Sequence, residues 1–112
     1  MKRLFLLFLL PFAANAQGDP STYPVATITT EHCVQLDANL PVSDLYQINI
    51  APFGFSTFEA AYNVFGMISN NLLTYTVDIL NQKAILEVHL DRTDVPQDIV
   101  WWNNYLQSLC AM

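Results

Sequence analysis

The sequence has very few basic residues. It contains ten acidic residues against four basic ones, and Lys2 and Arg3 account for half of the latter. Nucleic acids are bound chiefly by basic side chains that displace counterions, so this composition excludes nucleic-acid binding. Anionic membrane surfaces are disfavoured for the same reason. Cationic ligands, metal ions and basic protein partners remain compatible with the charge.

The signatures of catalysis and of cofactor binding are also missing. The chain has three glycines and contains no glycine-rich phosphate loop or dinucleotide fingerprint. No nucleophile stands in a readable arrangement with a histidine and an acid. We therefore expect a protein that is not an enzyme and that holds no cofactor, apart from the divalent metal ion considered below.

The only long apolar run stands at the start, in MKRLFLLFLLPFAANAQ. A charged beginning, apolar residues over 4–12 and small residues up to Ala16 identify residues 1–16 as a secretory signal peptide. The apolar run is shorter than the roughly 20 residues that span a bilayer, so we expect no direct membrane insertion. The exported chain would begin near Gln17, in the periplasm or outside the cell, with two basic and ten acidic residues.

The chain has two cysteines, Cys33 and Cys110, and no CxxC motif. An even number of cysteines in an exported protein favours a structural disulfide. Closing so long a loop would stabilise the fold by about 4 to 5 kcal/mol on the chain-entropy model.

Apolar periodicity divides the exported chain into strands and helices. Residues 17–24 are polar and proline-punctuated, so we predict a flexible linker, followed by a single α+β domain at 25–112. Alternating side chains at 73–79 and 83–91 predict an antiparallel hairpin covered on one face. The other predicted elements are an edge strand at 25–30, a strand at 45–51, a helix from Ser56 and a helix from Pro96.

The first of these helices has a readable start and a buried side. Ser56 and Glu59 have the spacing of a capping box, in which each side chain bonds a backbone amide of the other. Apolar residues at intervals of three and four predict the side that faces the core. These residues are Phe58, Ala61, Phe65 and Ile68.

The C-terminal part of the chain resembles the second half of a heavy-metal-associated domain, and the stretch concerned is VDILNQKAILEVHLDRTDVPQDIVWWNNYL. In that family a hairpin of the type V-D-x-x-x-x-K-A-x-V-x-x-D precedes a helix begun by a proline and an acid. The resemblance implies a ferredoxin-like two-layer sandwich, a small antiparallel sheet with two helices on one face. No strand follows the last helix, so residues 25–30 would take that edge. The family binds metal through M-x-C-x-x-C, whereas this chain reads APFGFSTFEA there, so no ligand is carried over.

The stretch EVHLD places Glu87, His89 and Asp91 on one side of a predicted strand, about 6 to 7 Å apart. Carboxylates around an imidazole can hold a divalent cation, and His32 is a further candidate ligand. The same residues are also typical of the solvent-exposed face of a strand in an acidic protein, and His32 of an exposed loop. Both interpretations remain open.

Four aromatic residues are candidates for contact with a partner. Trp101 and Tyr105 are four residues apart on the outer side of the last predicted helix, and Phe53 and Phe55 crowd the loop before the first helix. Exposed aromatic side chains are favoured anchors at protein interfaces. Alternatively, the N-terminal segment of the same chain covers them.

These observations predict an exported, non-enzymatic interaction module, such as a subunit or accessory of a cell-envelope complex, with a protein partner. The alternative is a divalent-metal-binding or metal-handling protein of the periplasm that uses His89, Glu87, Asp91 and His32.

Overall fold

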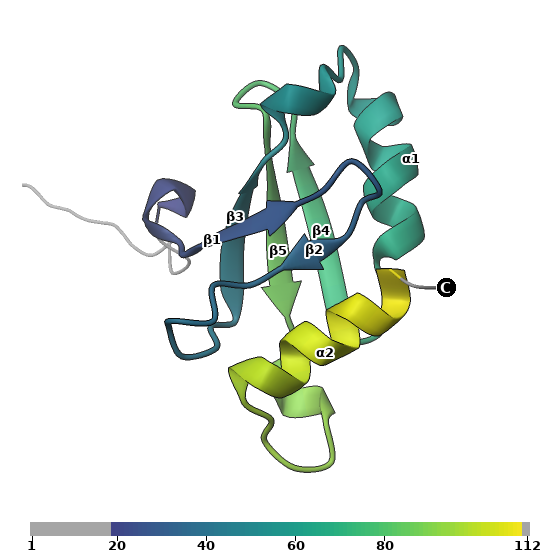
Figure 1. The fold of residues 1–112 in the computed structure, drawn as a ribbon. Coiled ribbons are helices and arrows are strands. Elements are labelled where there is room, and N and C mark those ends of the chain that lie inside the picture. Colours follow the sequence, from purple (N-terminus) through teal and green to yellow (C-terminus); the bar gives the residue numbers. More distant parts are fainter. Residues whose placement is uncertain (1–18, 111–112) are drawn as a thin grey trace, which may run out of the picture.

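The computed structural model describes residues 19–110, so the predicted signal peptide at 1–16 lies outside the described residues (Figure 1). The strands are β1 (Val25–Ile28), β2 (Val34–Gln35), β3 (Leu45–Asn49), β4 (Leu73–Asp78) and β5 (Lys83–Val88). The helices are α1 (Phe58–Ile68) and α2 (Ile99–Cys110). Short 3-10 helices are η1 (Pro20–Thr22), η2 (Ala51–Phe53) and η3 (Leu90–Arg92).

The strands form one five-stranded sheet in the order β2-β1-β3-β5-β4, which confirms the α+β class. Two details of the predicted sheet are wrong. β1 runs parallel to β3, so the sheet is mixed rather than antiparallel. The N-terminal strand is also not at the edge, because β2 pairs antiparallel with its outer side. β2 returns the chain to the end where β1 began, so β3 enters in the same direction as β1.

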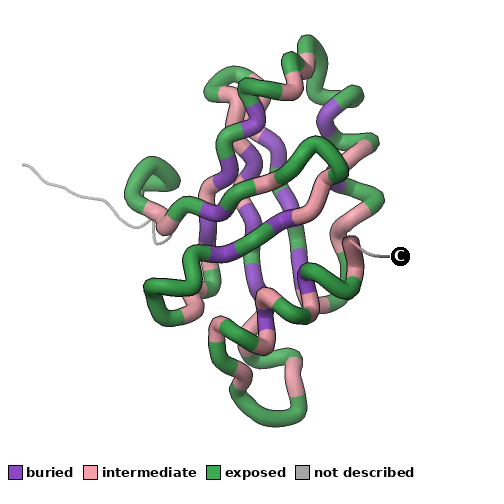
Figure 2. Tube along the Cα trace, viewed as in Figure 1, coloured by how far each residue is buried: buried purple, intermediate pink, exposed green. Residues whose placement is uncertain are grey.

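The core lies on one face of the sheet, and the buried residues of both helices belong to it. Figure 1 shows β1 and β2 crossing in front of β5 and β4, so the sheet curls around this face. In Figure 2 the buried positions follow the strands, while the outer surface of α1 is exposed. The buried strand residues include Ala26, Val34, Tyr46, Ile48, Leu73, Tyr75, Val77, Ala84, Leu86 and Val88.

The predicted hairpin is confirmed by the antiparallel pairing of β4 with β5, in which Tyr75 lies opposite Leu86. Its turn is stabilised by Asn81, whose backbone and side-chain N–H groups donate to the Asp78 carboxylate at 3.2 and 2.8 Å. These hydrogen bonds lower the pKa of Asp78. Gln82 completes the turn in the left-handed region, with a φ of 53°.

Helix α1 begins one residue later than the capping box predicts. Thr57 is the N-cap, and its hydroxyl accepts a hydrogen bond from the Ala60 N–H at 3.1 Å. Ser56 therefore stands outside the helix. Phe58 was predicted to be buried but is half exposed, and it stacks on Tyr62 one turn further along.

Helix α2 begins at Ile99 rather than at the predicted Pro96. The Asp98 carboxylate accepts a hydrogen bond from the Trp101 N–H at 2.9 Å, which satisfies one amide of the first turn. Asn103 then joins α2 to the segment after β2. Its side chain accepts from the Leu36 N–H at 2.8 Å and donates to the Leu36 carbonyl at 3.1 Å.

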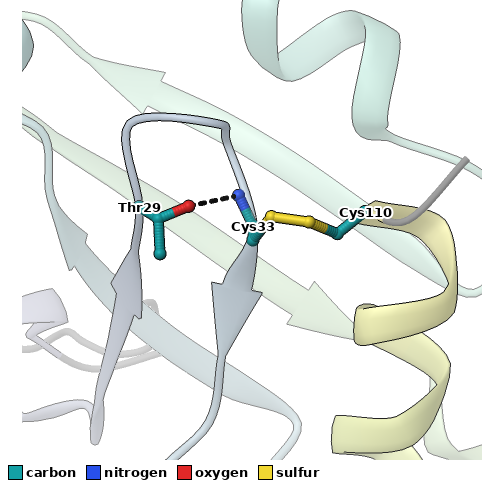
Figure 3. The surroundings of a disulfide bond; sticks show 3 residues. All are labelled: Thr29, Cys33 and Cys110. Atoms are coloured by element: carbon teal, nitrogen blue, oxygen red, sulfur yellow. Dashed lines mark hydrogen bonds between the residues drawn. A yellow bond between two sulfur atoms is a disulfide. The ribbon is translucent and has the colours of Figure 1, made fainter.

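The predicted disulfide between Cys33 and Cys110 is present, with a Cα–Cα distance of 5.2 Å. It ties the turn between β1 and β2 to the C-terminal end of α2 (Figure 3). The turn is tight, because the Thr29 N–H donates to the Cys33 carbonyl at 3.0 Å and the Thr29 carbonyl accepts from the His32 N–H at 2.9 Å. The Thr29 hydroxyl also accepts from the Cys33 N–H at 3.1 Å. His32 adopts the left-handed conformation, with a φ of 65°.

Residues 19–24, the described part of the predicted linker, lie against the outer face of the sheet. The Gln47 side chain donates to the carbonyls of Ser21 and Tyr23 at 3.0 and 2.7 Å. Residues 19–24 therefore cover the face opposite the core. Further along the N-terminal part of the chain, His32 packs against Phe53 with ring centroids 5.6 Å apart. Among the described residues, no helix is both long and apolar enough to span a bilayer.

Candidate functional site

The EVHLD stretch does not continue as a strand. β5 ends at Val88, and Asp91 lies in η3, so strand alternation does not extend to Asp91. His89 is hydrogen-bonded to the Thr74 hydroxyl at 2.7 Å through Nε2, and its Nδ1 lies 3.8 Å from a Glu87 carboxylate oxygen. The imidazole is thus held by Thr74 on the neighbouring strand and by the Glu87 carboxylate.

The candidate metal ligands do not form a coordination cluster. Glu87, His89 and Asp91 line the same shallow depression, but His32 lines a different pocket beside the disulfide. Within residues 19–110, no three His, Cys, Asp or Glu side chains converge closely enough to hold a metal ion.

The four candidate interface aromatics are half-buried and pack against the core. Phe53 stacks on Phe55 with ring centroids 5.6 Å apart, and Phe55 meets the buried Phe65 edge-on. Trp101 and Tyr105 stack at 5.5 Å on α2. The two pairs therefore belong to different elements, and each shares part of its surface with the core.

A more exposed aromatic surface lies on α1. Phe58 and Tyr62 are 50% and 55% exposed, and their rings stack with centroids 5.6 Å apart. Gly66 follows one turn later, and the Tyr62 ring lies over it, about 3.5 Å from where a Cβ would stand. We call Phe58, Tyr62 and Gly66 the α1 stripe. It runs along one flank of the helix, because its members are four residues apart.

A pocket of about 250 Å³ opens beside the disulfide, where the C-terminal ends of both helices meet the β1–β2 turn. We call it the disulfide pocket. Its apolar wall consists of Val34, Ile68, Leu106 and Leu109. Its rim carries Glu31, His32 and the strongly exposed Met67.

Tyr75 of β4 also lines the disulfide pocket, although the residue is only 7% exposed. Its hydroxyl has no hydrogen-bond partner within residues 19–110. Burial, with a smaller effect from Tyr105, raises the pKa of Tyr75, so the phenol remains protonated at neutral pH. The pocket thus combines an apolar wall with the Tyr75 hydroxyl, and the polar side chains of Glu31 and His32 stand on its rim.

Sequence reasoning missed both the α1 stripe and the disulfide pocket. Phe58 was assigned to the core by helical spacing, and Tyr75 by strand alternation. Only the pairing of Phe58 with Tyr62 at i and i+4 offered a signal for the α1 stripe. Comparisons of the chain with protein-family models, with curated proteins and with solved structures found no match.

Proposed function

We propose that the protein is an exported, non-enzymatic interaction module that binds a protein partner of the cell envelope through the α1 stripe. The observation that carries this proposal is the exposure of two stacked aromatic rings, Phe58 and Tyr62, on one flank of α1. About half of each side chain's surface remains to be buried, which corresponds to about 1 kcal/mol per ring. Two adjacent rings therefore offer enough apolar surface for an interface anchor.

The charge of the chain indicates the chemistry of the partner. Residues 19–110 contain ten acidic residues and two basic ones. Glu59 is exposed beside Phe58, and α1 contains no lysine or arginine. The two basic residues lie elsewhere, with Lys83 opposite Asp78 in the sheet and Arg92 bonded to the Asn71 carbonyl at 2.8 Å. A partner with an apolar surface bordered by lysine or arginine would complement this surface.

Export and the ferredoxin-like fold belong to the same proposal. The disulfide supports export, because such bonds persist in oxidising compartments. The order strand, helix, strand, strand, helix from β3 to α2, with β5 between β3 and β4, supports a ferredoxin-like arrangement. The likeness to a heavy-metal-associated domain is proposed at the level of this arrangement alone.

Site-specific photo-crosslinking in cells that naturally produce the protein tests the proposal. A benzophenone amino acid in place of Tyr62 should give a discrete covalent adduct with one envelope protein. Leu80 is the matched control position, because it is 92% exposed and lies in the turn between β4 and β5. The same adduct should not form from that position.

The partner identified in this way allows a quantitative test with purified proteins. Phe58→Ser combined with Tyr62→Ser should weaken binding at least about 30-fold, the loss typical of one interface hot spot. Leu80→Ser should have no effect, and added salt should weaken the wild-type complex. Equal adducts from both positions, or a partner that binds the double variant normally, would refute the proposal.

A further inference from the structure

We infer that the disulfide pocket binds a small, uncharged, largely apolar molecule that carries one hydrogen-bonding group, such as a phenol or an indole. The ligand would place its apolar body against Val34, Ile68 and Leu109 and its polar group on the Tyr75 hydroxyl. This site is separate from the α1 stripe and does not depend on the proposed protein partner.

The size of the pocket sets the size of the ligand. An engineered apolar cavity of about 150 Å³ admits benzene. The disulfide pocket, at about 250 Å³, is therefore large enough for a single substituted aromatic ring. Its walls are held in place by the Cys33–Cys110 bond, by α2 and by β4, so the pocket is largely preformed.

The Tyr75 hydroxyl determines the polar group. Tyr75 is more than nine-tenths buried, yet its hydroxyl remains unpaired within the described chain. Trp102 Nε1 is the one buried side-chain polar atom without a partner in residues 19–110, so the Tyr75 hydroxyl still reaches solvent at the pocket. A ligand that supplies a donor or acceptor would take the place of that water contact. A phenol or an indole provides such a group together with an apolar ring.

The charges around the pocket exclude anionic ligands. Of the described residues that line it, Glu31 is the one carboxylate, and none is lysine or arginine. His32 stands on the same rim, packed against the Phe53 ring with centroids 5.6 Å apart. A carboxylate ligand would thus meet an acid at the entrance and no cation inside.

Titrations of the oxidised exported chain, followed by NMR chemical shifts, test the inference. 4-Methylphenol and indole should bind with dissociation constants of about 1 mM, within the ligand efficiency usual for such small molecules. Toluene, which lacks the polar group, should bind more weakly, and benzoate weaker still. The shifted resonances should include those of Tyr75 and Leu109.

Two variants separate the hydrogen bond from the cavity. Tyr75→Phe should weaken the binding of 4-methylphenol and indole about fivefold and leave that of toluene unchanged. It should fold normally, because the hydroxyl makes no bond within the described chain. Leu109→Trp should fill the pocket and reduce the binding of every probe at least about tenfold. Val100→Trp, on the exposed side of the same helix, is its control.

The inference would be overturned by any of three results. The first is the absence of saturable binding of 4-methylphenol and indole to the wild-type chain. The second is an unchanged affinity of both probes for Tyr75→Phe. The third is a Leu109→Trp variant that is folded and still binds them. Loss of the protein partner would leave these results unaffected, so the two proposals can fail separately.

Discussion

Replacing both cysteines by serine should remove a large part of the stability of the fold. The bond joins residues 77 positions apart, and the chain-entropy model gives about 4.5 kcal/mol for a loop of this length. A small domain is typically stable by about 5 to 15 kcal/mol, so the Cys33→Ser/Cys110→Ser variant should lose roughly a third or more of its stability. The loss arises mainly from the freedom that the unfolded chain regains.

Urea unfolding followed by the fluorescence of Trp101 and Trp102 measures this loss. The far-ultraviolet circular dichroism of the folded variant should match that of the wild type, because the disulfide acts mainly on the unfolded chain. Thr29→Val is the local control, since it removes only the hydrogen bond to the Cys33 N–H and should cost about 1 kcal/mol. A double serine variant that loses less than Thr29→Val would contradict the reasoning.

Two further substitutions test how the helices are attached and begun. Asn103→Ala removes both hydrogen bonds to the Leu36 backbone and should lower the free energy of unfolding in urea by about 2 to 3 kcal/mol. Asn104→Ala is the control, because Asn104 is exposed on α2, and it should change this free energy by less than about 0.5 kcal/mol. An equal effect of the two changes would show that the Asn103 bonds contribute nothing. Thr57→Ala should lower the stability by about 1 kcal/mol and Ser56→Ala almost not at all, because Thr57 is the N-cap. A larger loss from Ser56→Ala would show instead that Ser56 caps the helix, as the capping box predicts.

The parts of the fold that follow from local periodicity could be predicted from the sequence. Leu73, Tyr75 and Val77 alternate with polar residues because one face of β4 is buried, and this alternation identified the hairpin. The disulfide could be predicted because a chain with two cysteines has one simple pairing. The parallel pairing of β1 with β3 could not, since it depends on how β2 turns the chain back.

Element ends account for most of the local errors. Ser56 and Thr57 are both good N-cap residues, and one position of difference decides which of the two stands in the cap. The predicted strand was extended too far, through His89 to Asp91. η3 begins at Leu90, and apolar spacing alone does not distinguish so short a 3-10 helix from the end of a strand. Asp91 lies in η3 rather than on the strand, although it still lines the same shallow depression as Glu87.

The disulfide pocket shows why a site can be invisible to periodicity. Its lining comes from the β1–β2 turn, α1, β4 and α2, and in each segment the contributing side chains follow an ordinary core pattern. A tyrosine in a buried position of a strand is normally read as packing, and Tyr75 fits that pattern along β4. What distinguishes it is that it lines a pocket and that its hydroxyl bonds no other described residue, and both facts depend on segments far apart in the sequence. Sites of this kind are therefore found from the polar groups that line pockets in three dimensions, and Tyr75→Phe is the substitution that separates packing from binding.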